Sequence, residues 1–363
     1  MMYVGIDQHA RHLTVCGRDE QGDSVLRRQV STQGNELDRF LQALQERTES
    51  QGGYVAMVEV CGFNGWLIQR LREHGCVRVC LITPPPRLRQ KTDRRDAGKL
   101  SELLWSNRNR IASGDRLVSL SEVYQPTAEE EHDRRLTHMR WRLGREQTRV
   151  KNQIKGILRR HNLQHACPTK GVFTRAGLEW LTTVALMEMD RVELDMRLEE
   201  YRLHAGHIRQ VDAWIAERAR RDPRVPLLRT VAKIGKYTAL ALSSHIGPIG
   251  RFRHARSLAN FFGVTPGCRS SGQTERMGSI TKAGHPLVRF LLGQMVLHAL
   301  RSDPGLRRWY QRIKRRRGCK IARVAVMRRL CEAIWHILSK QIRYRPVGPP
   351  RASERSESSP CAA

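Results

Sequence analysis

The chain has 363 residues, and its 65 Lys and Arg against 35 Asp and Glu give a formal net charge of +30 and a pI near 10.9. This length allows two or three domains, each with its own core. An ordinary metabolic enzyme does not need so high a positive charge. The charge predicts a polyanionic partner, above all nucleic acid. Non-specific adhesion, or adhesion to a membrane surface, is the alternative explanation of the charge.

The sequence predicts neither a membrane anchor nor a secreted protein. No apolar run approaches the ~20 residues of a membrane span, and Asp7 interrupts the only apolar stretch near the start, unlike a signal peptide. The nine cysteines are scattered, odd in number and without a Cys-x-x-Cys pair, which excludes a zinc ribbon and a disulfide scaffold. Cys16, Cys76 and Cys80 are interpreted as core residues of strands, and a reduced cytoplasm is the expected compartment.

The first third of the chain alternates between β-type and α-type patterns. Strands are expected at 3–9, 13–18, 24–30, 54–60 and 77–83, and helices at about 36–46, 65–74 and 87–106, with Pro84–Pro86 stopping the last strand. Three strands followed by alternating helices and strands favour an α/β domain over 1–125, with a mixed sheet flanked by helices. This is the element order of an RNase H-like domain.

A basic helix is expected at 130–163, where apolar residues recur every seven positions from Leu136 to Ile157. Between Arg134 and Arg160 there are ten Lys and Arg but one acid, Glu146. Such like charges repel one another in isolation, which favours a helix that faces phosphates over a merely solvated face.

A second long helix is expected at 178–220, and its apolar residues are also spaced by seven. They are Met187, Leu194, Tyr201, Ile208 and Ile215. This spacing predicts a coiled coil that joins copies of the chain into a dimer or tetramer. An intramolecular hairpin with the first helix would bury the same stripe. Residues 126–222 are therefore expected to form a basic, coiled-coil linker.

Asp222-Pro223 ends that helix and begins a mostly helical domain at 223–345. Helices are expected at about 227–233, 237–246, 254–262, 285–302, 304–316 and 319–343, with an irregular polar loop at 264–284. From Arg301 to Arg345 there are fifteen Lys and Arg against two acids. The tail at 346–363 is rich in Pro, Ser and Ala and is predicted to be disordered.

Four carboxylates stand where acid is unusual in so basic a chain. Asp7 lies inside an apolar strand, Glu59 ends another, and Asp93 and Asp96 are three apart on one helix. Converging carboxylates can hold two divalent cations ~3.5–4 Å apart for phosphoryl transfer. The sequence predicts a site for Mg²⁺ or Mn²⁺ at these four residues, with surface ion pairs to the neighbouring arginines as the alternative for the helical pair.

Two further segments contain candidate phosphate chemistry. Val231–Lys236 resembles a helix-hairpin-helix, in which N–H groups at a helix start hold a DNA phosphate, but Ala232 replaces the usual first glycine and a plain helix turn fits nearly as well. In the polar loop, Ser270 and Ser271 precede Gly272. A serine there can act as a nucleophile, whereas Ser and Gly are also common loop residues.

Taken together, the motifs resemble those of the DEDD transposases of bacterial insertion sequences, described as bridge-RNA-guided recombinases, from about Tyr3 to about Arg343. The matching segments are Gly5-Ile6-Asp7, Val58-Glu59 followed by Gly62, Lys91-Thr92-Asp93-Arg94-Arg95-Asp96-Ala97, Phe261-Phe262-Gly263-Val264-Thr265-Pro266, Ser271-Gly272 and Thr281-Lys282-Ala283-Gly284-His285. Each segment is weak alone, and their joint order and spacing are specific.

The resemblance implies a DNA transposase or site-specific recombinase, acting in the bacterial cytoplasm at the nucleoid. Asp7, Glu59, Asp93 and Asp96 would be the metal-binding tetrad of the RNase H-like domain, and Ser271 the nucleophile that forms a phosphoserine link to DNA. The two regions would meet across protomers joined by the coiled coil. A structured noncoding RNA would choose the target by base pairing.

Alternatives remain open at this stage. Ser270 adjoins Ser271, so the nucleophile assignment can be off by one position. A metal-dependent junction nuclease would use the tetrad and leave Ser271 structural. An inactive remnant that only binds nucleic acid, acting as a repressor, would show neither chemistry.

Overall fold

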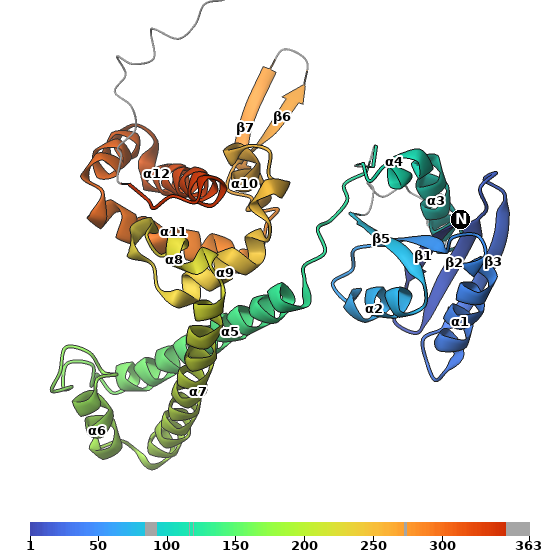
Figure 1. The fold of residues 1–363 in the computed structure, drawn as a ribbon. Helices are drawn as coiled ribbons and strands as arrows, with labels where there is room; N and C mark the ends of the chain where they lie inside the picture. The colour runs from blue at the N-terminus through green and yellow to red at the C-terminus, as the bar shows by residue number, and fades with distance from the viewer. Residues whose placement is uncertain (84–92, 116, 119, 272–273, 346–363) are drawn as a thin grey trace, which may run out of the picture. The chain divides into compact units, whose positions relative to one another are not determined.

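A computed structural model describes residues 1–83, 93–115, 117, 118, 120–271 and 274–345, and within these ranges the side chains at 93–95, 268–271 and 274–277 are not described. The chain divides into two compact units, Met1–Gln125 and Pro126–Ala363 (Figure 1). The expected strand stop at Pro84–Pro86, the beginning of the helix expected from 87 and the tail at 346–363 lie outside the described residues. The four-part domain division stays a prediction.

The first unit is built on a five-stranded mixed sheet with the order β3-β2-β1-β4-β5. Its strands are β1 (Met2–Gln8), β2 (His12–Arg18), β3 (Ser24–Ser31), β4 (Tyr54–Glu59) and β5 (Cys76–Ile82). Strand β2 pairs antiparallel with β1 and β3, while β4 pairs parallel with β1 and β5. The expected α/β class with a mixed, RNase H-like sheet is confirmed.

Helices cover both faces of this sheet. Helices α1 (Glu36–Glu49) and α2 (Gly65–Glu73) pack on one face, with Phe40, Leu41 and Leu71 among their buried residues. Helix α3 (Asp93–Ser106) packs on the other face through Leu100 and Leu104 and is followed by the short α4 (Arg108–Ala112). Sheets covered on both faces need near-continuous apolar strands, as β4 and β5 show.

The predicted core cysteines are buried in these strands. Burial raises the pKa of Cys76 to about 12 and that of Cys80 to about 11. Both thiols therefore stay protonated at neutral pH and serve as small apolar side chains. Their interpretation as packing residues is confirmed for Cys16, Cys76 and Cys80.

Gly5 is where α3 approaches the sheet most closely. A Cβ atom at Gly5 would lie 2.3 Å from the carbonyl oxygen of Ala97 and 2.4 Å from the backbone nitrogen of Ser101. We expect Gly5→Ala to lower the free energy of unfolding by about 2–3 kcal/mol, because the helix must move away from the strand. Urea unfolding of the full chain measures it. The matched control is Gly98→Ala, since a Cβ at Gly98 meets nothing within 4 Å; equal midpoints for the two variants would contradict the packing.

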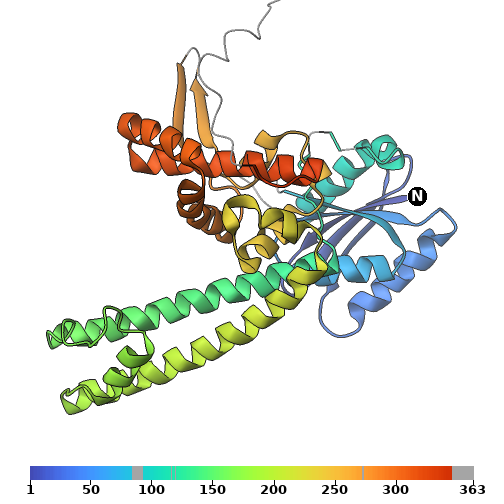
Figure 2. The ribbon, with the colours of Figure 1, turned by 60° about the vertical axis from the view of Figure 1, so that its left-hand side comes forward.

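The second unit begins with a helical hairpin. Helix α5 (Ala128–Arg160) starts at a capping box between Thr127 and Glu130, and α7 (Glu188–Arg221) returns along it, so that the two helices run side by side (Figure 2). The short α6 (Arg175–Thr183) lies between them in the chain. The single helix expected at 178–220 is wrong at its start, because the helix breaks between Thr183 and Glu188. The guanidinium of Arg191 donates to the carbonyls of Leu181 and Val184, at 3.0 and 3.3 Å, and so satisfies the end of α6.

The heptad stripe expected along α7 is buried in part. Leu194 and Ile215 are buried, Tyr201 and Ile208 are half-buried, and Met187, the N-cap residue, is 73% exposed. Leu194 and Leu198 pack with Val150, Ile154 and Ile157 of α5. Farther along α7, Val211 and Ile215 belong to the core that α5 shares with the C-terminal helices. The intramolecular hairpin that the sequence left open is therefore what the chain itself forms, and association between copies stays a prediction.

The rest of the second unit is mostly helical. Its elements are α8 (Arg224–Leu228), η1 (Val231–Lys233), α9 (Lys236–Ile246), η2 (Ile249–Arg251), α10 (Ala255–Phe261), β6 (Pro266–Ser271), β7 (Thr274–Ile280), α11 (Pro286–Ser302) and α12 (Pro304–Lys340). The helices expected at 304–316 and 319–343 meet within α12 at Gly318, whose φ of 82° and ψ of 166° interrupt the helix. No helix in the described part of the chain is long and apolar enough to span a membrane.

The irregular loop expected at 264–284 is wrong for most of its length. Strands β6 and β7 pair antiparallel from Pro266↔Ile280 to Ser271↔Thr274, which makes a β-hairpin with two residues between the strands. Such short connections favour paired strands over irregular backbone. The sequence pattern did not reveal this hairpin because its residues are mostly polar and show no regular alternation of apolar and polar residues.

Candidate active site

The sheet brings Asp7 and Glu59 to the same edge. Strands β1 and β4 are parallel and in register up to Ile6↔Val58, and Asp7 and Glu59 each follow that pair by one residue. Neighbouring parallel strands lie about 4.8 Å apart. The two acids therefore stand next to each other where β1 and β4 end.

Both carboxylates lie on the sheet face that α3 covers. Side chains alternate between faces along a strand, so Asp7 shares a face with Tyr3 and Gly5, and Glu59 with Val55 and Met57. Tyr3, Val55 and Met57 belong to the core cluster of α3. Asp7 is buried, with 7% of its surface exposed, whereas Glu59 is half-buried.

Helix α3 runs antiparallel to β1, which directs its first turn toward Asp7. Near its end, Trp105 Nε1 donates to the carbonyl oxygen of Glu20 at 3.0 Å, and the Glu20 carboxylate binds the amino group of Met1 at 2.8 Å. The last turn of α3 therefore lies beside the beginning of β1. Toward the other end, α3 passes Gly5 at Ala97, so its first turn lies at the level of Asp7.

That first turn carries the remaining two acids. Asp96 directly precedes Ala97 and is half-buried, and Asp93 lies one helical turn before Ala97. The side chain of Asp93 is not among those that the structure describes. Among the described side chains, no group of three His, Cys, Asp or Glu is arranged to hold a metal ion. The placement of the backbone agrees with the predicted tetrad, and the metal site itself stays a prediction.

Two residues that the sequence analysis missed hold this edge of the sheet. His9 Nε2 lies 3.0 Å from Oδ2 of Asp7, and the His9 ring stacks on His12 at 4.8 Å. Residues i and i+2 of an extended chain share a face. The spacing Asp7-Gln8-His9 could therefore have predicted the contact between Asp7 and His9. His9 fixes the orientation of the Asp7 carboxylate.

Asn64 is the second missed residue. Its amide nitrogen donates to the side chain of Gln8 at 2.8 Å and to the carbonyl oxygen of Glu59 at 2.9 Å, and its oxygen accepts from the N–H of Cys61 at 2.8 Å. Asn64 is buried and ties the end of β1 to the end of β4. It is thus a positioning residue for the pair of acids, and no sequence pattern points to it.

The candidate nucleophile lies in the second unit. Ser271 is the last residue of β6, paired with Thr274, and Ser270 is paired with Glu275. The structure does not describe the side chains of these two serines, and it does not describe Gly272 at all. The choice between Ser271 and Ser270 therefore stays a prediction.

The basic face of α5 is partly used for packing within the chain. Arg140 Nε pairs with Asp212 at 2.7 Å, Arg160 pairs with Asp190 at 2.5 Å, and Arg134 donates to the carbonyl oxygen of Ser244 at 2.8 Å. Arg142 and Arg145 are exposed, and within the described part of the chain neither has a carboxylate at ion-pair distance. Lys155 and Arg159 are exposed on the same helix and likewise have no carboxylate at ion-pair distance in the described ranges. The phosphate-facing interpretation can therefore apply to part of the helix, and it stays a prediction.

The segment that resembles a helix-hairpin-helix has an unusual backbone. Ala232 and Lys233 have φ angles of 52° and 51°, a left-handed conformation that glycine adopts without strain. Gly235 is the N-cap of α9 and, being glycine, has no side chain to cap the first turn. Ala232 thus takes a backbone conformation that glycine favours, and the choice between a phosphate-binding hairpin and a plain helix turn stays a prediction.

Comparisons with known proteins show that the chain is similar to transposases. Residues 4–163 match a family model of DEDD transposases of the IS110 type, and residues 225–311 match the transposase family IS116/IS110/IS902. The chain is 26% identical to a protein named "Probable family 20 transposase" from Pseudomonas aeruginosa, over 94% of this chain and 98% of that protein. It is 25% identical to "Transposase for insertion sequence element IS1111A" from Coxiella burnetii, over 94% of this chain and 91% of that protein.

Proposed function

Because the chain belongs to the IS110 family of insertion-sequence transposases, we propose that it cuts and rejoins DNA with a metal-binding acidic tetrad and a serine nucleophile. The observation that carries this proposal is the adjacent placement of Asp7 and Glu59, with the first turn of α3 on the same face of the sheet. Divalent cations are held by carboxylates gathered in this way.

The residues fit a hard divalent cation. All four candidates, Asp7, Glu59, Asp93 and Asp96, offer carboxylate oxygens, which Mg²⁺ and Mn²⁺ prefer. The buried position of Asp7 and its contact with His9 fix one donor before a cation arrives. When bound, the cations would neutralise the charge that develops on the phosphate during transfer.

In the proposed step, Ser271 attacks a phosphodiester of the DNA backbone. A bond forms between Oγ of Ser271 and phosphorus, while the bond from phosphorus to one deoxyribose oxygen breaks. The proton of the serine hydroxyl ends on that leaving oxygen, so one phosphodiester is exchanged for another and no net hydrolysis occurs. A hydroxyl of a second strand reverses the step and releases the serine.

We further propose that the protein acts as a homo-oligomer. The inner stripe of α7 is buried in part by α5, but Met189, Met196 and Leu203 form a second stripe, also spaced by seven, with 76%, 60% and 57% of their surfaces exposed. A heptad stripe on the outer face of a helical hairpin supports packing against another copy. In a dimer or a tetramer, another copy of the chain would bury this stripe.

Target choice by a structured noncoding RNA is the last part of the proposal. The charge of +30 and the exposed Arg142 and Arg145 support broad phosphate contacts with little reading of base edges. We expect the full chain, purified at low salt, to retain a discrete RNA that sequencing maps to DNA flanking its own gene. Its affinity for that RNA should fall about 10³-fold between 50 and 200 mM salt, which filter binding measures. Recovery of only random fragments, or an affinity independent of salt, would count against RNA guidance.

A further inference from the structure

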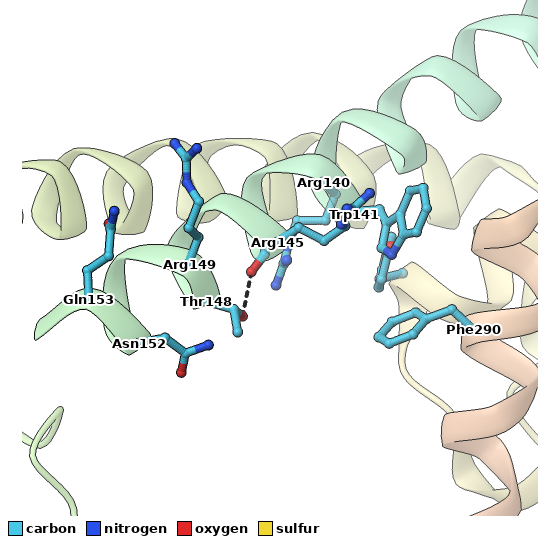
Figure 3. A pocket seen from close by; sticks show the side chains of 10 residues that line it. Arg140, Trp141, Arg145, Thr148, Arg149, Asn152, Gln153 and Phe290 are labelled. Atoms are coloured by element: carbon cyan, nitrogen blue, oxygen red, sulfur yellow. Dashed lines mark hydrogen bonds between the residues drawn. The ribbon is translucent and has the colours of Figure 1, made fainter. Parts of the chain in front are cut away.

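The second unit contains a pocket that the proposed chemistry does not use. It has a volume of about 760 Å³ and lies between α5, the beginning of α9 and α11 (Figure 3). Its lining includes Trp141, Arg145, Thr148 and Asn152 of α5, Tyr237 of α9 and Phe290 of α11. This volume is in the range of sites that bind a ligand the size of a nucleotide.

Phe290 gives the pocket an exposed aromatic surface. Its side chain is 47% exposed, although a phenylalanine on a helix normally faces the core. The ring centroid of Trp141 lies 6.4 Å away, with the two ring planes at 42°. Trp141 is itself covered by the ring of His138 at 5.5 Å and by the guanidinium of Arg145 at 5.2 Å. Phe290 is therefore the open ring of this pair.

The pocket is positively charged, and among the described residues that line it none is acidic. Arg140 is neutralised by Asp212, and Arg149 by Glu146 at 3.0 Å. Arg145 has no carboxylate at ion-pair distance within the described ranges, and its contact with Trp141 holds the guanidinium at the pocket. This leaves one positioned cation for an anionic group of a ligand.

The remaining walls supply hydrogen-bonding groups. The amide of Asn152 and the hydroxyl of Thr148 lie on one side of α5, whereas the side chain of Gln153, which also lines the pocket, points the other way (Figure 3). The Thr148 hydroxyl donates to the carbonyl of Gly144 at 2.8 Å, which leaves its oxygen able to accept. On the opposite side, Tyr237 is the second residue of α9 and follows the N-cap Gly235. Tyr237 therefore places the beginning of α9 at the edge of the pocket.

An exposed ring, a positioned guanidinium and amide groups together fit an unpaired nucleotide. Bases of single-stranded DNA or RNA stack on aromatic side chains, and arginines contact their phosphates. A base within a duplex is paired and stacked on both faces, so it cannot enter without being unstacked. We propose that this pocket binds one unpaired nucleotide, its base against Phe290 and its phosphate at Arg145. The inference deepens the proposed function and rests on it.

Binding of short oligonucleotides to the full chain tests this inference. The probes are a thymidine 12-mer, a uridine 12-mer, an abasic deoxyribose 12-mer and a DNA duplex, followed by fluorescence polarisation at one salt concentration. We expect Phe290→Ala to weaken the thymidine or uridine strand about 10-fold, and the abasic strand and the duplex less than 2-fold. Arg145→Gln is expected to weaken every single strand about 5-fold, because it removes a charge-assisted phosphate contact.

Matched variants control for general effects. Leu297→Ala alters the same helix as Phe290 at similar exposure, 51% against 47%, and Arg135→Gln removes from the helix of Arg145 an exposed charge that pairs with Glu131 at 3.0 Å. Both controls should bind the thymidine and uridine strands within 2-fold of the original chain. Circular dichroism melting should be unchanged in all four variants.

The outcomes separate the two proposals. If Phe290→Ala weakens the abasic strand as much as the thymidine strand, or weakens neither, while the original chain binds nucleic acid, the nucleotide pocket is wrong and the proposed function stands. If the original chain binds none of the probes, the proposed function fails as well. A loss confined to the uridine strand or to the thymidine strand identifies RNA or DNA as the source of the nucleotide.

Discussion

Replacement of Ser271 by alanine is expected to reduce strand exchange by about 10³-fold or more, because no other group then forms the covalent link to DNA. The loss should be visible as the disappearance of a protein–DNA adduct that resists boiling in detergent. The assay uses the full chain with its copurified RNA, a plasmid carrying the ends of the element and Mg²⁺. DNA binding should be unchanged, since one hydroxyl contributes little to a surface dominated by arginine.

Ser270→Ala is the matched control for this prediction. It changes the same side chain on the same strand, one position away, and should retain the adduct and strand exchange within a few-fold. If Ser270→Ala abolishes the adduct while Ser271→Ala retains it, the nucleophile is Ser270. If Ser271→Ala still exchanges strands, and Asp96→Asn does not, the protein is a metal-dependent junction nuclease or recombinase without serine chemistry.

Asp7→Asn is expected to reduce DNA cleavage by about 10²–10⁴-fold without unfolding the protein. The amide keeps the shape of the carboxylate and can still contact His9, but it removes a negative charge that would bind a cation. The readout independent of activity is the number of Mn²⁺ ions bound by the full chain, counted by electron paramagnetic resonance. At a Mn²⁺ concentration that fills the site of the original chain, we expect the variant to lose at least one bound ion.

Asp38→Asn is the control for Asp7→Asn. Asp38 lies in the same unit, and its carboxylate is exposed and pairs with Arg70 at 3.4 Å. Loss of a surface ion pair has little effect on stability, so Mn²⁺ binding and cleavage should both be unchanged. If Asp7→Asn binds as much Mn²⁺ as the original chain and still cuts DNA, Asp7 is structural and the tetrad is wrong.

The sequence was sufficient to predict the strands and helices of the first unit, because short runs of neighbouring residues determine them. Strands β4 and β5 are apolar runs bounded by Gly and Pro, and the acids at 7 and 59 stand out only against such strands. The parallel pairing that aligns them follows from the order of elements. The contacts of Asn64 with Gln8 and Glu59 could not be predicted, since they depend on how a turn folds back across two strands.

In the second unit, the sequence pattern is compatible with more than one arrangement of the helices. The heptad stripe of α7 fits a partner helix from any chain, and only the three-dimensional path through α6 selects α5 of the same chain. The sequence of the β6–β7 hairpin is mostly polar and lacks the regular apolar–polar alternation that would predict paired strands. The exposed position of Phe290 could not be predicted either. Helix α11 is apolar on most of its surface, and its sequence does not indicate which apolar residue remains uncovered.

The most direct test of the account is a crystal structure of the full chain grown with Mn²⁺ and recorded at the manganese absorption edge. We predict an anomalous peak at the end of β1 and β4, with oxygens of Asp7, Glu59 and Asp96 about 2.1–2.3 Å from it. Carboxylates that turn away from one another, with manganese bound elsewhere or not at all, would contradict the proposed metal site and the chemistry built on it.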